Sequence, residues 1–170
     1  IINGIPSGLE IDEDYILHQL SRRQKGHGRG RRMKIESDKA EIYAGVRLGK
    51  TIGAPIGLII KNMDHKNWTS IMQIDKSNKE NKKITLPRPG HADLAGVEKF
   101  GFSDIRNVIE RSSARETAMR VAIGSICRKL LKIIGIEIGS RVIQIHDVSD
   151  DSAINLNNGA ESISLEADKS

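Results

Sequence analysis

The strongest structural signal in this sequence is one long amphipathic helix over residues 113–135. Ser113 and Glu116 have the spacing of a capping box, in which both side chains accept backbone N–H groups at the start of a helix. Mostly apolar residues then recur at helical spacing until Gly135, a residue type that commonly ends helices. The pattern predicts a helix whose inner face consists of Ala118, Val121, Ala122, Ser125, Ile126, Lys129 and Leu130.

Shorter segments predict the remaining elements. Asp12 can cap a helix that continues to about Gln24, with Tyr15, Ile16 and Leu20 on its inner side. Alternating or fully apolar residues predict three strand regions, and a glycine-flanked turn joins the first two. The strand regions are 40–47, 55–61 and 136–148, and the turn is 49–53. This mixture of helices and strands predicts an α+β fold.

The length of 170 residues fits a single domain over 1–170. Residues 75–83 are polar and rich in lysine, and we expect them to form a mobile surface loop. Residues 149–170 are polar and acidic, and they contain no predicted element. The sequence lacks an initiator methionine and ends without a closing element, so we expect an excerpt of a longer protein.

The net charge of +5, from 27 basic and 22 acidic residues, is compatible with nucleic acid, a membrane surface or an anionic small molecule as the partner. Several arginines converging on one ligand hold phosphates or carboxylates in a planar fork, although a merely solvated basic face is the alternative. Nucleic acid is a second alternative, but aromatic residues make up only 3% of the chain, so stacking platforms are largely absent. The clustered basic residues are Arg22, Arg23, Lys25, Arg29, Arg31, Arg32 and Lys34.

The cysteine count and the lengths of the apolar runs indicate the cellular compartment. The single cysteine excludes an internal disulfide and the common cysteine-based zinc sites, and it favours a reducing compartment. No apolar run approaches the roughly 20 residues of a membrane span, and the start has no signal-peptide pattern. No histidine pair has metal-ligand spacing, so no metal is predicted. We therefore expect a cytoplasmic protein without a membrane partner.

Two local patterns predict sites for chemistry. His91 follows Arg88, Pro89 and Gly90 on a tight turn, where it could act as an acid near neutral pH; a structural histidine is the alternative. Residues 111–113, Arg-Ser-Ser, precede the long helix, where unpaired N–H groups attract an anion such as a phosphate or a flavin. A capping role alone is the alternative there.

Four segments of the chain resemble the chorismate synthase family in order and at family spacing. The resemblance extends from Gly4 to about Leu131, and the form of residues 104–110 resembles the members found in Gram-positive bacteria. The four segments are 22–36, 45–56, 88–93 and 111–122.

The resemblance implies both a reaction and a fold. Members of this family are carbon–oxygen lyases that convert 5-enolpyruvylshikimate 3-phosphate to chorismate, the last common step of aromatic amino acid biosynthesis in the shikimate pathway. The reaction is a 1,4-anti elimination of phosphate that requires reduced FMN. The implied fold is a sandwich of helices between antiparallel β-sheets, usually in a homotetramer. The implied partner is this small-molecule substrate rather than nucleic acid or membrane.

The resemblance also implies roles for individual residues. His91 resembles one of two active-site histidines, and Arg32 and Arg88 resemble substrate anchors. The segment Arg111, Ser112 and Ser113 resembles the FMN-binding segment. Two further arginines resemble positions that bind NADP or another anionic ligand, with NADPH as a reductant; these are Arg23 and Arg29.

Two expected parts of the family pattern are absent from the sequence. The other active-site histidine belongs to a Gly-Glu-Ser-His-Gly motif that would precede Ile1, and the second half of the family would follow Ser170. We therefore expect the chain alone to be inactive. A basic anion-binding or nucleic-acid-binding module without catalysis is the alternative reading.

Overall fold

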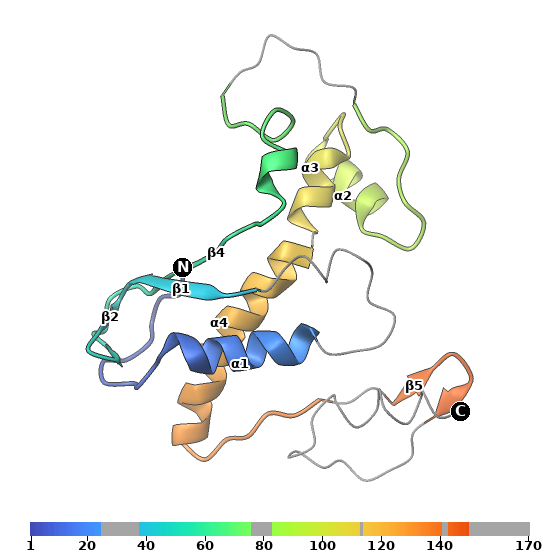
Figure 1. Ribbon diagram of the computed structural model, residues 1–170. Helices are drawn as coiled ribbons and strands as arrows, with labels where there is room; N and C mark the ends of the chain where they lie inside the picture. The colour runs from blue at the N-terminus through green and yellow to red at the C-terminus, as the bar shows by residue number, and fades with distance from the viewer. Residues whose placement is uncertain (25–37, 76–82, 113, 141–142, 150–170) are drawn as a thin grey trace. The chain divides into compact units, whose positions relative to one another are not determined.

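The computed structural model describes residues 1–24, 38–75, 83–112, 114–140 and 143–149 (Figure 1). The helices are α1 (Glu13–Gln24), α2 (Asp93–Phe100), α3 (Arg106–Arg111) and α4 (Ala114–Ile133), with a short 3-10 helix η2 (His65–Asn67). The strands are β1 (Ala40–Ala44), β2 (Val46–Arg47), β3 (Lys50–Thr51), β4 (Gly57–Ile60), β5 (Gln144–Ile145) and β6 (Val148–Ser149).

Every strand pairing in the described part of the chain is antiparallel: β1 with β4, β2 with β3, and β5 with β6. The predicted α+β class is confirmed. The chain divides into two compact units, one of residues 1–61 and 121–170 and one of residues 62–120. Among the described residues, every strand lies in the first unit, and the second unit contains η2, α2 and α3.

Helix α1 of the first unit forms where the sequence predicts it. The backbone N–H of Tyr15 donates to Asp12 Oδ1 at 2.7 Å, which satisfies one of the donors left open at a helix start. Ile16 and Leu20 are completely buried one helical turn apart, and α1 packs against β1. Burial of a large aliphatic side chain contributes roughly 1.5–3 kcal/mol. The cap and the apolar face therefore both fix this helix.

The segment between β1 and β4 departs from its prediction. The predicted turn at 49–53 instead contains β3, which pairs with β2 so that Arg47 lies opposite Lys50. The actual turn is Leu48 and Gly49, both with positive φ, 51° and 74°. Two central residues of positive φ form the tight type I′ hairpin turn, whose twist matches that of the strands. The glycines in this region indicated a turn, but not which two residues occupy it.

Thr51 on β3 joins the N-terminal segment to this hairpin. Its hydroxyl donates to Pro6 O at 2.6 Å and accepts from Leu9 N–H at 2.9 Å, and the residue is only 2% exposed. Buried polar groups of this kind are stable only when they are hydrogen-bonded. Ile2 also forms reciprocal backbone bonds with Ile56, at 3.0 and 2.8 Å.

Helix α4 confirms the strongest prediction along most of its length. Ala118, Ala122, Ser125 and Ile126 are buried, as the helical pattern predicts. The helix ends at the predicted glycine: Gly135 has a φ of 79°, and the next N–H bonds to Leu131 O at 2.9 Å. This bond and the one from Gly135 N to Lys132 O form a Schellman motif. The predicted capping box depends on Ser113, which lies outside the described residues.

The predicted strand region 136–148 is largely wrong. Residues 136–140 form no strand, and in the described part of this region only the two-residue strands β5 and β6 pair, across His146 and Asp147. Runs of isoleucine indicate strands through β-branching, but a strand also requires a partner that satisfies its backbone. Most of the predicted loop 75–83 and of the polar segment 149–170 lies outside the described residues.

Helices α2 and α3 of the second unit are absent from the sequence prediction. They contain eight and six residues, too few for a helical period to emerge. The two helices pack closely at Gly96, where a Cβ would lie 2.9 Å from Val108 Cγ2. Gly101 in the left-handed conformation ends α2. The close contact at Gly96, rather than helix length, therefore stabilises these two short helices.

Candidate functional site

The turn before α2 places Arg88 and His91 next to each other. The N–H of His91 donates to Arg88 O at 3.3 Å, and Gly90 has a φ of 71°. Proline followed by a glycine of positive φ is the arrangement of a type II turn, so the predicted turn is confirmed. Arg88 and His91 are both exposed. The turn therefore presents a cation and an imidazole from the same short segment.

Arg88 is anchored by Asp93, the first residue of α2. Arg88 Nε donates to Asp93 Oδ2 at 2.8 Å, and Nη2 donates to Oδ1 at 2.9 Å. The backbone N–H of Arg88 also donates to Oδ2, at 2.9 Å. The Asp93 side chain is completely buried, whereas the Arg88 side chain is 45% exposed. The pair is therefore bidentate, with its carboxylate inside the unit and its guanidinium at the surface.

This arrangement stabilises the charged form of both partners. The side-chain hydrogen bonds from Arg88, followed by the bond from its backbone N–H, hold the pKa of Asp93 well below its usual range. Burial acts in the opposite direction but is outweighed. The same hydrogen bonding raises the pKa of Arg88. Both groups are thus charged throughout the range in which enzymes work.

Asp93 has no role among the residues predicted from the sequence. Its signal in the sequence is an aspartate at the start of a helix, five residues after an arginine that precedes a Pro-Gly turn. Aspartate is favourable in a first helical turn in any case, so the pattern has an ordinary explanation. Only the burial of Asp93 and its bidentate contact with Arg88 distinguish it from an ordinary residue at a helix start.

The orientation of His91 follows from a single hydrogen bond. Its Nδ1 lies 3.0 Å from Pro89 O. A carbonyl oxygen can only accept, so Nδ1 is the protonated nitrogen in this contact, and Nε2 is the ring atom that can exchange a proton with another molecule. The turn therefore fixes which nitrogen of His91 is available for chemistry.

The predicted flavin segment begins at the end of α3. Arg111 is the last residue of α3, and Ser112 caps it, with its N–H bonding to Val108 O at 3.0 Å. The Arg111 guanidinium lies over the Phe100 ring, 4.6 Å from its centroid, and Phe102 stacks on the same ring at 5.6 Å. Ser113, the third predicted member, lies outside the described residues.

Arg23 lies in the first unit, unlike Arg88, His91 and Arg111. Its Nη1 lies 3.2 Å from Asp38 Oδ2, and the Asp38 side chain is 3% exposed. Arg23 therefore also pairs with a buried carboxylate. The other two predicted anion-binding arginines, Arg29 and Arg32, lie outside the described residues.

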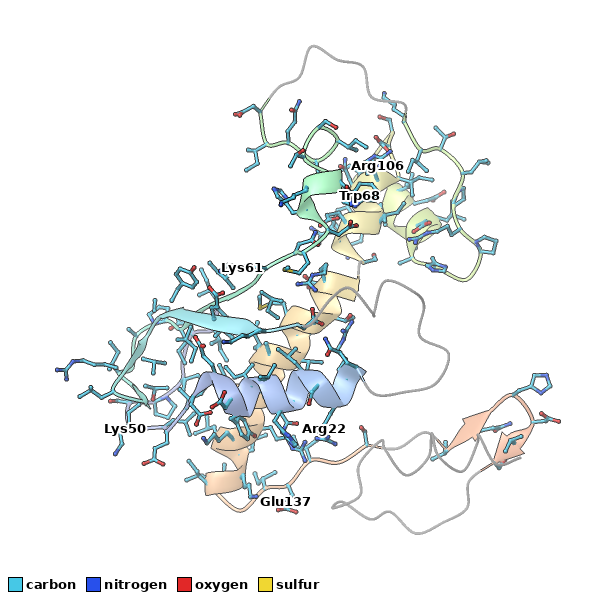
Figure 2. The ribbon with its side chains drawn as sticks, viewed as in Figure 1. Arg22, Lys50, Lys61, Trp68, Arg106 and Glu137 are labelled. Carbon is cyan, nitrogen blue, oxygen red and sulfur yellow. The ribbon has the colours of Figure 1, made fainter. Side chains whose placement is uncertain are left out.

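A cavity of about 230 Å³ lies in the first unit, and none of the described residues predicted as site residues lines it. One side is formed by α1 and α4, and the other by the segment after α4 that includes Glu137 (Figure 2). Its lining mixes cations, one carboxylate and apolar groups, and this mixture does not define a ligand class. The lining residues are Tyr15, Gln19, Arg128, Lys132, Ile136, Glu137 and Ile138.

The described residues contain neither a metal cluster nor a membrane-spanning helix. No group of three or more His, Cys, Asp and Glu side chains is arranged there to hold a metal ion. None of the helices described combines the length and the apolar character needed to cross a membrane.

Comparison with known proteins gives a consistent result. Residues 1–169 match the family model of chorismate synthase. The chain is 57% identical to a chorismate synthase of Pelodictyon phaeoclathratiforme and 54% identical to one of Chlorobaculum parvum, with all of this chain covered in both cases. It is 53% identical over 92% of its length to chorismate synthase 2 of Bacillus thuringiensis. These similar identities do not separate a Gram-positive subgroup from the others.

A solved structure is similar as well. A crystal structure of chorismate synthase has 40% sequence identity and a TM-score of 0.60, covering 88% of this chain and 34% of that one. The chain spans less than half the length of its curated relatives, 44% and 43% for the first two species named above. The likeness therefore extends over nearly all of this chain but only part of each relative.

Proposed function

This chain belongs to the chorismate synthase family, and from that premise we propose that the complete protein forms chorismate. The substrate is 5-enolpyruvylshikimate 3-phosphate, and the reaction is a 1,4-anti elimination of its phosphate that requires reduced FMN. The observation that supports this most is the turn with Arg88 and His91, because it presents an anchored cation and an imidazole from one short segment.

In this proposal the exposed side of Arg88 binds a phosphate or carboxylate of the substrate. A guanidinium is always charged and fits either group with two parallel hydrogen bonds. Arg32 is a second proposed anchor. His91 handles a proton through Nε2, because its Nδ1 is bonded to Pro89 O.

Arg111, Ser112 and Ser113 form the proposed contact with FMN. Arg111 and Ser112 are both exposed, and a cation beside a hydroxyl is a donor set that fits a phosphate group. Reduced FMN, when bound, supplies the electron-rich group that the reaction requires although it has no net redox change. In this proposal these residues bind FMN and orient it.

Further properties follow from family membership and are proposed on that ground alone. Arg23 and Arg29 bind NADPH or another anionic ligand, and NADPH is a source of reducing equivalents. The complete protein is a cytoplasmic homotetramer. Light scattering on the purified complete protein tests the tetramer, and a dimer or monomer would contradict it.

The direct test of the function is an anaerobic assay of the complete protein with substrate and reduced FMN. We expect chorismate and inorganic phosphate to appear in equal amounts while the flavin stays reduced. Omission of the reductant is the control and should abolish both products. Absence of both products with reduced flavin and folded protein would refute the proposal.

The basic excess makes nucleic-acid binding the competing hypothesis. A protein that contacts several phosphates loses affinity steeply as salt increases, because it releases counterions. We expect the complete protein to show no such salt-dependent binding to single- or double-stranded DNA or to RNA in fluorescence anisotropy. A steep slope would favour the binding-module hypothesis over catalysis.

A further inference from the structure

We propose that Asp93 is a positioning residue of the substrate site, which holds one edge of the Arg88 guanidinium so that another edge faces an oxyanion of the substrate. The inference deepens the proposed function and rests on it. It concerns a residue that would touch Arg88 rather than the substrate.

The geometry of the Arg88–Asp93 pair supports this role. Both carboxylate oxygens of Asp93 accept from the guanidinium, and Oδ2 accepts from the Arg88 backbone as well. Two parallel bonds fix the plane of a guanidinium, whereas a single bond would allow it to rotate. The backbone bond fixes the position from which the side chain starts. Asp93 thus determines both where the Arg88 side chain begins and how its end is oriented.

The two partners also differ in burial. The Asp93 side chain is completely buried, and the Arg88 side chain is 45% exposed. A guanidinium has five N–H donors, and the contacts with Asp93 use Nε and Nη2. Nη1 belongs to a different edge of the fork. A second carboxylate or phosphate can therefore meet the same guanidinium without displacing Asp93.

The proposed role of Asp93 is to orient Arg88 and not to add attractive charge. A carboxylate next to an arginine reduces the net positive charge that attracts an anion, so Asp93 does not increase the electrostatic pull. Its contribution is to hold the fork in one orientation before the substrate arrives, which lowers the entropy lost on binding. A site that needed only positive charge would be better served without Asp93.

Asp93→Asn in the complete protein tests this idea, because it keeps the size of the side chain and removes its charge and one acceptor. We expect the KM for 5-enolpyruvylshikimate 3-phosphate to rise about tenfold or more, with a smaller change in kcat, since a misplaced binding group costs ground-state affinity.

Asp104→Asn is the matched control. Asp104 accepts only backbone N–H groups in the contacts described, from Ile84 at 3.2 Å and Arg106 at 3.0 Å. It should lower thermal stability while KM stays within about twofold.

A double-mutant cycle with Arg88→Ala decides whether Asp93 acts through Arg88. If it does, adding Asp93→Asn to Arg88→Ala changes KM by less than about twofold. An equal rise in KM in both backgrounds would overturn the inference, and so would a KM for Asp93→Asn that matches the wild type.

Arg88→Lys provides a second variant that leaves Asp93 intact. Lysine keeps the charge but cannot form the fork, so we expect a rise in KM of about the same size as with Arg88→Ala. Wild-type KM in Arg88→Lys would show that charge alone suffices and would also overturn the inference. Failure of the wild type to form chorismate would refute the proposed function instead, so the two failures are distinguishable.

Discussion

At the residue scale, two of the described arginines that were predicted to bind anions pair with a buried carboxylate. Arg23 meets Asp38 and Arg88 meets Asp93, and both carboxylates are almost or completely buried. A buried carboxylate is costly unless it is paired, and a guanidinium in return is held in place by it. These two arginines are therefore anchored side chains rather than mobile surface charges.

The buried pair predicts a specific dependence of stability on pH. The pKa of Asp93 is lowered by Arg88, so its carboxylate favours the folded state above the ordinary aspartate pKa of 3.8. This contribution is lost as pH falls through the folded-state pKa. We expect the difference in Tm between wild type and Asp93→Asn to be constant above about pH 5 and to shrink at lower pH. Thermal melts at a series of pH values measure it, and a constant difference down to pH values near 3 would contradict the account.

Sequence reasoning located Arg88 and His91 on a turn because proline and glycine restrict the backbone locally. It did not identify Asp93, because the role of that residue depends on burial, and burial is set by how α2 packs. It also did not foresee the contact between Arg111 and Phe100, residues eleven positions apart that meet only because α2 and α3 pack. The roles of His91, Arg88, Arg111 and Ser112 in binding and catalysis remain predictions.

At the element scale, the long helices were predictable and the short ones were not. Helix α4 has 20 residues, enough for its apolar period and its terminal glycine to be recognised. Helices α2 and α3 are stabilised by their mutual contact at Gly96 instead. The strand prediction for 136–148 failed because β propensity says little about whether a pairing partner exists.

Two glycine substitutions should change stability in opposite directions. Gly96→Ala places a methyl group against the Val108 side chain, and such overpacking costs about 1–3 kcal/mol. At Gly124, in α4, a methyl group would have no atom of the described residues within 4 Å, apart from its chain neighbours and the backbone of the helix itself. Gly124→Ala should therefore stabilise the protein by about 0.5–1 kcal/mol through helix propensity.

Denaturant unfolding of the two variants and of the wild type measures both free energies. Equal effects of the two substitutions would show that α2 and α3 do not approach as closely as described.

At the scale of the whole molecule, the chain covers only part of the length of its family relatives. It matches the family model over residues 1–169 but spans 43% of the length of the Chlorobaculum parvum relative. The sequence correctly predicted this partial coverage, because four family motifs occurred in order while others did not. It also predicted the α+β class from its mixed helices and strands.

The partial coverage predicts that the 170-residue chain alone does not form chorismate. A binding site assembled from the whole protein cannot be completed by less than half of it. The isolated chain and the complete protein should be assayed together under reduced FMN, with circular dichroism to establish that the isolated chain is folded. Chorismate formation by the folded isolated chain at a rate close to that of the complete protein would contradict this prediction.

The central claim is that the turn with Arg88 and His91 is part of a chorismate-forming site. The most direct measurement is kcat for His91→Ala in the complete protein, beside His65→Ala, an exposed histidine of η2. The account predicts a fall in kcat of about 10²–10⁴-fold for His91→Ala, the usual contribution of a general acid or base, and little change for His65→Ala. Unchanged kcat in a folded, flavin-saturated His91→Ala protein would contradict it.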